Sequence, residues 1–299
     1  MIDANVEVGI SGRYKFIIKK DGVIKSETPW FKNLITNQGM NLLSTSAAWH
    51  SWCQVGSGST APAFTDTALV ARIAAATNSA NLVGTIDTTN HYFVGTTSYT
   101  FSAGAAAGNI AEVGVGTAST GTTLFSRALV LDTNGNPTTI TVLAGEDLVV
   151  VYQVRMKQPQ GDFTGTTSGN AWTMRAANQN LSQSNGWAAN GRAQHVGPGS
   201  NGVYLAYTGT IGPLSGVPSG TSSDAGASSV ANIAYVADSW ERGILITFTT
   251  ALANQSNKCF TWSIGFTFWQ VEFSTPIVKT NLQTLKLGFK MSWTRDAGP

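Results

Sequence analysis

Charged residues are scarce in this chain of 299 residues: Asp, Glu, Lys and Arg make up 11% of it, against roughly 25% in typical soluble domains. Hydrophobic residues reach 42%, so the composition is that of a chain that folds. The polar surface must therefore come mostly from Ser, Thr, Asn, Gln and Gly. A surface with so few charges contributes little to the solubility of a free monomer. We therefore expect partner subunits to cover much of this surface.

The few charges nearly cancel, with 18 Lys and Arg against 16 Asp and Glu and a net charge of +2. Binding to nucleic acid or to an anionic membrane would need a clear basic excess, so neither partner is expected. The start of the chain lacks the basic segment and apolar run of a signal peptide, and no stretch approaches the roughly 18 apolar residues of a membrane span. We expect a protein that is not inserted in a membrane and is kept in the cytoplasm until something releases it.

Cysteine and histidine are also rare. Cys53 and Cys259 are the only cysteines, and two thiols provide neither a disulfide framework nor a four-ligand metal site. Their apolar neighbours indicate small buried side chains. His50, His91 and His195 are dispersed, with no Glu or Asp spaced as a metal pair. We therefore expect no metal and no cofactor.

Sequence patterns that carry catalysis are missing too. There is no Gly-x-Ser-x-Gly elbow, and three dispersed histidines do not assemble a nucleophile, a base and an orienting acid. Gly114-Val115-Gly116 is not followed by the further glycine or the lysine of a phosphate-binding loop. Glu146-Asp147 lies in an expected turn, which explains these adjacent carboxylates. A glycosidase pair from distant positions stays open as an alternative, but we expect no enzyme.

What the chain does have is a series of short β-like runs separated by Gly and Asn turns. A hairpin is expected at the start, where Asp21-Gly22 joins Arg13–Lys20 to Val23–Thr28 with positive φ angles. Further strands are expected at Ser51–Val55, Tyr92–Phe101, Ile110–Val115, Leu124–Val130, Thr138–Leu143, Leu148–Met156, Ala171–Ala176, Ile244–Thr249, Lys258–Phe273 and Leu282–Trp293. One face of the last strand should be buried, because apolar residues recur at period two at Leu285, Leu287, Phe289 and Met291.

Helical patterns are few and short. Asn33–Leu43 is expected to form one short helix, weakened by Gly39. Thr65-Asp66-Thr67 indicates a helix start with a short turn through Ala68–Ile73. The low-complexity run Ala74–Asn81 predicts an exposed connection. The expected fold is therefore mainly β: an antiparallel β-sandwich, jelly-roll-like, with one or two short helices and a long loop-rich insertion.

Several short segments of this chain occur in the same order as similar segments in one protein family. In this chain they are Thr28–Gly39, Val55–Pro62, Thr65–Leu69, Asn109–Val115, Leu124–Ala128, Val154–Met156 and Ser292–Arg295. Together they resemble tailed-bacteriophage virion structural proteins of the tail, fibre-adaptor or baseplate type. The resemblance implies a β-sandwich assembly domain formed by 1–165 plus 280–299, with 166–279 as an inserted or second β-rich, loop-rich region. The family has no catalytic residues to carry over.

The function implied by this resemblance is that of a structural subunit in the tail, tail-fibre attachment or baseplate and tip region of a phage particle. Such a subunit would be made in the host cytoplasm and reside in the virion. We expect it to form a homo-oligomer, as a ring or trimer, and to dock to other virion proteins. The contacts should use uncharged surface such as Ala74–Thr88 and Ala103–Thr123.

Aromatic residues in the Gly- and Asn-rich middle region support an alternative, a module that binds host-surface glycan on the same particle. Rings on loops beside Asn and Gln can stack on sugar rings. The candidate contact residues are Trp172, Trp187, Tyr204, Tyr207 and Trp240. A competing interpretation is that most of these rings anchor irregular loops to the sandwich. A third hypothesis, an enzyme acting on cell-wall or capsule polymer, has no residue pattern behind it.

Overall fold

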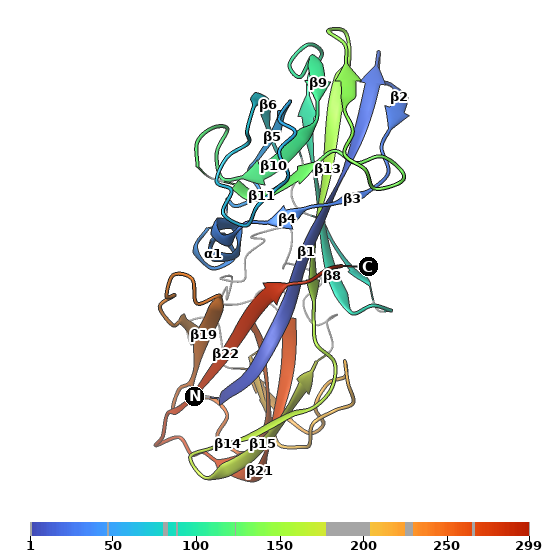
Figure 1. Cartoon of the computed structure of the whole chain (residues 1–299). Coiled ribbons are helices and arrows are strands. Elements are labelled where there is room, and N and C mark those ends of the chain that lie inside the picture. Colours follow the sequence, from blue (N-terminus) through green and yellow to red (C-terminus); the bar gives the residue numbers. More distant parts are fainter. Residues whose placement is uncertain are drawn as a thin grey trace. The chain divides into compact units, whose positions relative to one another are not determined.

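A computed structural model describes residues 2–46, 48–79, 83–87, 89–122, 124–177, 204–224, 230–264 and 267–298. These residues form a mainly β fold with several antiparallel sheets and one helix, α1 (Asn37–Thr45) (Figure 1). The chain divides into two compact units. Unit 1 comprises Met1–Gly9, Ile86–Phe93 and Met156–Thr294, and unit 2 comprises Ile10–Thr85, Val94–Arg155 and Arg295–Pro299.

Four sheets build the two units. A nine-stranded sheet contributes strands to each of them: β1 (Ile2–Lys20), β2 (Val23–Glu27), β3 (Phe31–Lys32), β7 (Val83–Asp87), β8 (Tyr92–Phe101), β13 (Asp147–Lys157), β18 (Val230–Asn232), β19 (Glu241–Phe248) and β22 (Leu285–Arg295). Unit 2 adds a five-stranded sheet in the order β4 (Leu34–Ile35), β11 (Leu124–Leu129), β10 (Glu112–Gly116), β5 (Trp52–Gly56) and β6 (Arg72–Thr77). It also holds the pair β9 (Gly108–Ile110) and β12 (Ile140–Val142). Unit 1 adds a six-stranded sheet in the order β14 (Phe163–Thr167), β15 (Asn170–Ala176), β21 (Thr267–Val278), β20 (Ser256–Ile264), β16 (Leu205–Tyr207) and β17 (Ser222–Asp224).

Aromatic side chains fill the core of unit 2. The rings of Tyr14 on β1 and Tyr152 on β13 lie 4.8 Å apart, and the Tyr14 hydroxyl is hydrogen-bonded to the Ser126 hydroxyl on β11 at 2.7 Å. Trp49 packs on Phe125, also on β11, with ring centroids 4.3 Å apart. Side chains from two sheets therefore meet in one buried layer, which is the arrangement of a β-sandwich. The predicted fold class, mainly β and sandwich-like, is confirmed.

Unit 1 is built in the same two-layered way. Trp262 on β20 stacks on Phe289 of β22, with ring centroids 4.8 Å apart and an interplanar angle of 14°. Phe248 on β19 packs on Phe260 of β20 at 5.8 Å. All four rings are buried, so β19 and β22 cover one face of the six-stranded sheet and close a second core.

The two ends of the chain form the strands that the sequence predicts. Asp21 and Gly22 have φ angles of +51° and +80°, the left-handed pair that a two-residue hairpin turn requires. β1 is longer than predicted and begins at Ile2. At the other end β22 pairs with β19 along eight residues of each strand. The predicted buried face of β22 is confirmed for Leu287, Phe289 and Met291, which are buried. Leu285, at the start of the strand, is partly exposed.

The helix begins later than predicted. Leu34 and Ile35 form β4 and pair with β11, and the Thr36 hydroxyl accepts the Gly39 amide as the N-cap of α1. The prediction was wrong for Leu34 and Ile35 because two adjacent apolar residues fit a strand as well as a helical face. Close packing explains why a glycine stands at position 39, since a Cβ there would lie 2.0 Å from the Phe125 carbonyl oxygen.

The stretch after β5 also differs from the prediction. Thr65-Asp66-Thr67 starts no helix and Ala68–Ile73 forms no helical turn. The Asp66 carboxylate pairs with Arg127, so it is not used as a helix cap. The predicted exposed connection Ala74–Asn81 is wrong for its first residues, which belong to β6 at the edge of the five-stranded sheet. A short Ala-rich strand has little of the β-branched signal that the prediction relied on.

The two units also divide the chain differently from the predicted domains. The sequence groups 1–165 with 280–299, whereas unit 1 combines Met156–Thr294, including most of β22, with the first residues of β1. The described part of 166–279 contributes strands to both layers of unit 1.

Candidate functional site

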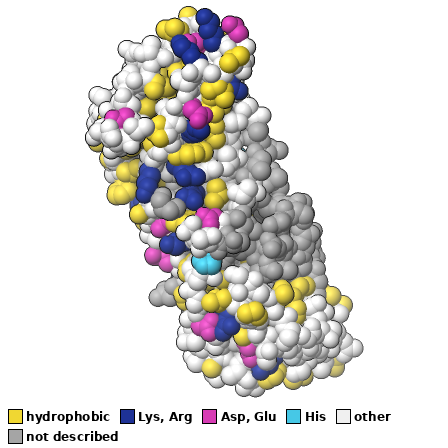
Figure 2. All heavy atoms as spheres, turned by 90° about the vertical axis from the view of Figure 1, so that its right-hand side faces the viewer, with side chains coloured by type: hydrophobic (Ala, Val, Ile, Leu, Met, Phe, Trp, Pro, Cys, Tyr) yellow, Lys and Arg dark blue, Asp and Glu magenta, His cyan; other side chains and the backbone are white. Residues whose placement is uncertain are grey.

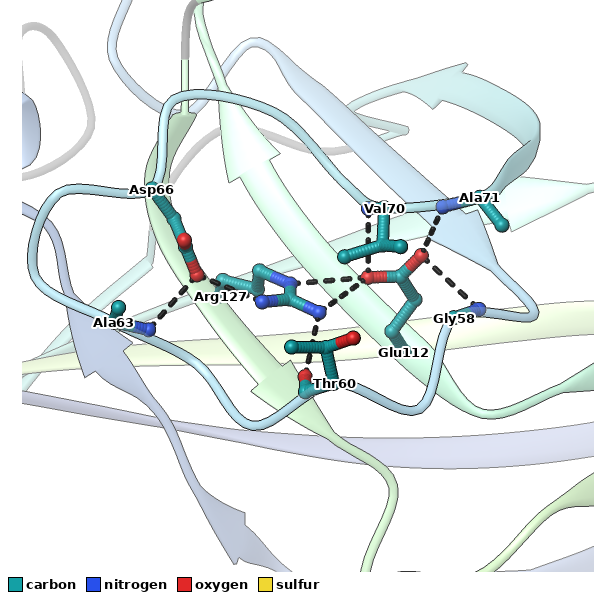
Figure 3. A network of polar contacts seen from close by, with 8 residues as sticks. All are labelled: Gly58, Thr60, Ala63, Asp66, Val70, Ala71, Glu112 and Arg127. Carbon is teal, nitrogen blue, oxygen red and sulfur yellow. Dashed lines mark hydrogen bonds and ion pairs between the residues drawn. The ribbon is translucent and has the colours of Figure 1, made fainter.

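Residues 57–71 connect β5 to β6 without a strand or helix of their own, yet a buried charged network fixes their course (Figure 3). Its centre is the pair of Glu112 on β10 and Arg127 on β11, which are 0% and 1% exposed. The strands themselves place these side chains, because Arg127 is paired with Gly114, two residues from Glu112 along β10. Residues two apart on a strand point to the same face.

Arg127 reaches the loop with its guanidinium. Nη1 donates to Asp66 Oδ2 at 2.7 Å and Nη2 to the Thr60 carbonyl oxygen at 2.8 Å. Nε donates to Glu112 Oε2 at 3.0 Å. Asp66 Oδ2 also accepts the Ala63 amide at 2.9 Å. One side chain from the sheet therefore holds the loop at Thr60 and at Asp66.

Glu112 holds the beginning and the end of the same loop. Its Oε1 accepts the Ala71 amide at 2.7 Å and the Gly58 amide at 3.2 Å, while Oε2 accepts the Val70 amide at 3.1 Å. Glu112 also leaves no room for side chains at Gly58, where a Cβ would lie 2.5 Å from Oε1. Both carboxylate oxygens accept donors of the loop, so Glu112 fixes the course of the loop at both of its ends.

The clamped loop, residues 57–71, presents apolar side chains to solvent. Phe64 is 50% exposed and Val70 58% exposed, and Ile73 follows on β6 at 38%. The Arg295 guanidinium lies 4.1 Å from the centroid of the Phe64 ring, and its Nε donates to the Ile35 carbonyl oxygen at 2.7 Å. Apolar side chains held in place before binding form a favourable contact surface for a partner, since little ordering is left to be done.

Unit 1 carries an open groove of about 710 Å³ on the outer face of its six-stranded sheet. Hydroxyl side chains from three strands line it: Thr164, Thr166, Thr173 and Ser274. Arg175 and Asp162 also line it and form an ion pair, 2.6 Å from Nη2 to Oδ2. The groove offers hydrogen-bonding groups, and its apolar lining comprises the small Ala171, the buried Trp172 and the partly exposed Ile211.

Three of the four predicted aromatic contact residues that the structure describes are buried. Trp172, Tyr204 and Tyr207 are only 5%, 8% and 7% exposed, which favours the interpretation that these rings anchor the fold. Trp172 packs against Gly165, where a Cβ would lie 2.4 Å from its Cζ2. Trp240 is partly exposed. Trp187 lies outside the described residues.

Reactive groups are few in the described residues. Both cysteines are buried as predicted, and burial raises the pKa of Cys259 to about 12 and that of Cys53 well above its ordinary value. Such thiols are poor nucleophiles at neutral pH. Within the described ranges, no three His, Cys, Asp or Glu side chains are grouped to hold a metal ion, and no helix has the length and apolar character to cross a membrane.

Comparison with models of protein families, with curated proteins and with solved structures finds no match to this chain. The network was missed in the sequence, although a signal for it exists. Glu112 and Arg127 are single charges inside otherwise apolar or small strand segments of a charge-poor chain. Since an unpaired buried charge is very costly, two such residues on neighbouring strands predict a pair.

Proposed function

We propose that this chain is a non-enzymatic structural subunit of a tailed-bacteriophage particle, in the tail, tail-fibre attachment or baseplate region. It acts by assembling with copies of itself and by docking to neighbouring virion proteins. The observation that carries the proposal is the clamped loop, in which a buried network serves to present Phe64 and Val70 to solvent. A loop that is fixed and apolar suits a permanent protein contact.

The rest of the surface supports the same role. Much of the face in Figure 2 is white, the colour of the backbone and of side chains that are neither hydrophobic nor charged, and the charged side chains lie in small groups. Such a surface gives little electrostatic repulsion between copies. The proposal that the particle is a tailed phage rests on the sequence segments that resemble phage structural proteins and occur in the same order.

The proposal is tested by quantifying this chain in purified particles. Mass spectrometry should find it at a fixed copy number relative to the other tail proteins. The double variant Phe64→Ser/Val70→Ser should fold but enter particles at a clearly reduced copy number. The matched control is Val278→Ser/Leu282→Ser, which changes two residues in unit 1 that are 68% and 87% exposed. A particle that lacks the chain contradicts the proposal.

A second candidate function, binding of host-surface glycan, is favoured by the groove on unit 1. Its hydroxyls and the Asp162–Arg175 pair could hydrogen-bond to sugar hydroxyls. A glycan array with the purified chain tests it, and Thr173→Val should abolish any signal that arises in the groove. Binding that survives this change would have another origin.

A further inference from the structure

β14 is an edge strand of the six-stranded sheet in unit 1. It pairs with β15 from Phe163 opposite Met174 to Thr167 opposite Asn170. Ser168 and Gly169 form the two-residue turn between them, with φ angles of +48° and +77°. On its other side β14 has no neighbouring strand among the described residues. It is therefore open to pairing with another chain.

The register shows which main-chain groups face this open edge. Residues that flank a two-residue turn exchange both main-chain hydrogen bonds, and the following pairs alternate between bonded and non-bonded. Counting from Thr167, the pair of Gly165 and Trp172 is bonded, whereas Thr164 and Thr166 make no ladder bonds to β15. The N–H and C=O groups of Thr164 and Thr166 therefore point outward. No hydrogen bond joins these groups to any other described residue.

β14 also lacks the features that usually protect an edge. Its sequence, Phe-Thr-Gly-Thr-Thr, contains no charge, no proline and no bulge. The neighbouring Asp162 is paired with Arg175 at 2.6 Å. The edge strand β2 is different, because it carries Lys25 and Glu27 and a bulge interrupts its pairing with β1. Of these two edges, only β14 is left suited to self-association.

We propose that β14 pairs with β14 of a second copy of this chain, antiparallel and about a two-fold axis at Gly165. In this register Thr164 of each copy lies opposite Thr166 of the other. Each such pair exchanges two main-chain hydrogen bonds, so four bonds satisfy all the outward groups of both strands. The two Gly165 residues meet at the non-bonded position, where the strands come closest and the absence of a side chain removes any obstacle.

The composition of β14 fits this partner. Thr164 and Thr166 are exposed on the same face of the strand, so the register creates two Thr–Thr cross-strand pairs, a favourable combination in antiparallel sheets. The contact is self-complementary, as a two-fold interface must be. This inference rests on the proposed function, in which copies of the chain assemble. It adds that the oligomer contains an even number of copies, because a lone ring of three has no such axis.

The test uses the full chain and the variant Thr164→Pro in analytical ultracentrifugation. Proline removes an outward N–H that makes no bond to β15, so the hairpin is kept while the pairing is lost. We expect the wild type to form an oligomer with an even number of copies and the variant to associate at least tenfold more weakly. Thr164→Val, the matched control, keeps every main-chain group and a β-branched side chain and should associate like the wild type.

A second variant covers the case that Thr164→Pro fails to fold. Thr164→Lys/Thr166→Lys places like charges opposite each other in both pairs and should also give monomers at low salt. A wild type that is monomeric or trimeric, or variants that associate normally, would overturn the inference. Hydrogen exchange separates it from the proposed function. If the Thr164 and Thr166 amides exchange freely in particles that contain the chain, the pairing is wrong and the function stands. If the amides are protected in a dimer that never enters particles, the pairing stands and the function is wrong.

Discussion

Arg127 is the cation at the centre of the network that holds the clamped loop. Replacing it with methionine leaves the fully buried Glu112 carboxylate without its counter-charge, which costs about 3–5 kcal/mol for a buried pair. We expect Arg127→Met to lower the free energy of unfolding of unit 2 by about this amount, measured by urea denaturation.

The matched control is Arg175→Met, which breaks an ion pair whose side chains are 22% and 44% exposed. A pair open to solvent contributes roughly 0–1 kcal/mol. If the two variants were destabilised equally, the Arg127 network would not be what holds residues 57–71 in place.

His50 makes stability depend on pH. Burial lowers its pKa, and within the described residues its buried Nδ1 has no hydrogen-bond partner. The folded chain therefore favours neutral imidazole, whereas the unfolded chain takes up a proton near the ordinary pKa of 6.5. The contribution of His50 to stability is complete above pH 6.5 and is lost as the pH falls from there through the lowered pKa.

Thermal unfolding at about pH 7.5 and about pH 5.5 tests this, since these values bracket the titration of an ordinary histidine. His50→Phe keeps an aromatic ring against Trp49 but cannot be protonated. The variant should lose less stability than the wild type on acidification. An identical loss in both would mean that His50 is protonated in the fold without cost.

β22 is an element whose removal unit 1 should not tolerate. It contributes four buried side chains to the core of unit 1, with solvent exposures of 8%, 0%, 1% and 2%: Leu287, Phe289, Met291 and Trp293. Burial of each such side chain is worth about 1.5–3 kcal/mol, and whole domains are stable by only about 5–15 kcal/mol. A chain truncated after Thr284 should therefore show no cooperative unfolding of unit 1 by calorimetry. A transition at the temperature of the full chain would contradict this.

Local turn chemistry explains which elements could be predicted from the sequence. Asp21-Gly22 identified the first hairpin, and Tyr92–Phe101 was predicted with the bounds of β8 because its aromatic and β-branched residues are typical of strands. β6 and the two-residue strands β3 and β4 were missed. Their pairing depends on partners distant in the chain, such as Arg127 and Ser126 for β4, and no local pattern carries that information.

The candidate site was less predictable than the fold. The aromatic residues chosen from the sequence are mostly core, because composition alone does not tell which side of a strand faces out. Glu112 and Asp66 are brought to Arg127 from positions 15 and 61 residues away. Such a network follows from tertiary packing. Its only signal in the sequence is the presence of single charges inside apolar strand segments, where an unpaired charge would be costly to bury.

For the whole molecule, the neutral surface predicts oligomers that resist salt. Contacts made of apolar groups and hydrogen bonds between uncharged groups do not weaken when charges are screened. Light scattering of the purified chain should give the same oligomer mass at low and at high salt. Dissociation on adding salt would show that the few charged residues hold the copies together.

The central claim, that this chain is a phage subunit working through contacts with copies of itself and with neighbouring proteins, is tested most directly by a reconstruction of the particle that contains it. The account predicts several copies in contact, each with its two β-sandwich units, and residues 57–71 buried against a neighbouring protein. Copies that touch neither one another nor any neighbour through this loop, or particles without the chain, would contradict it.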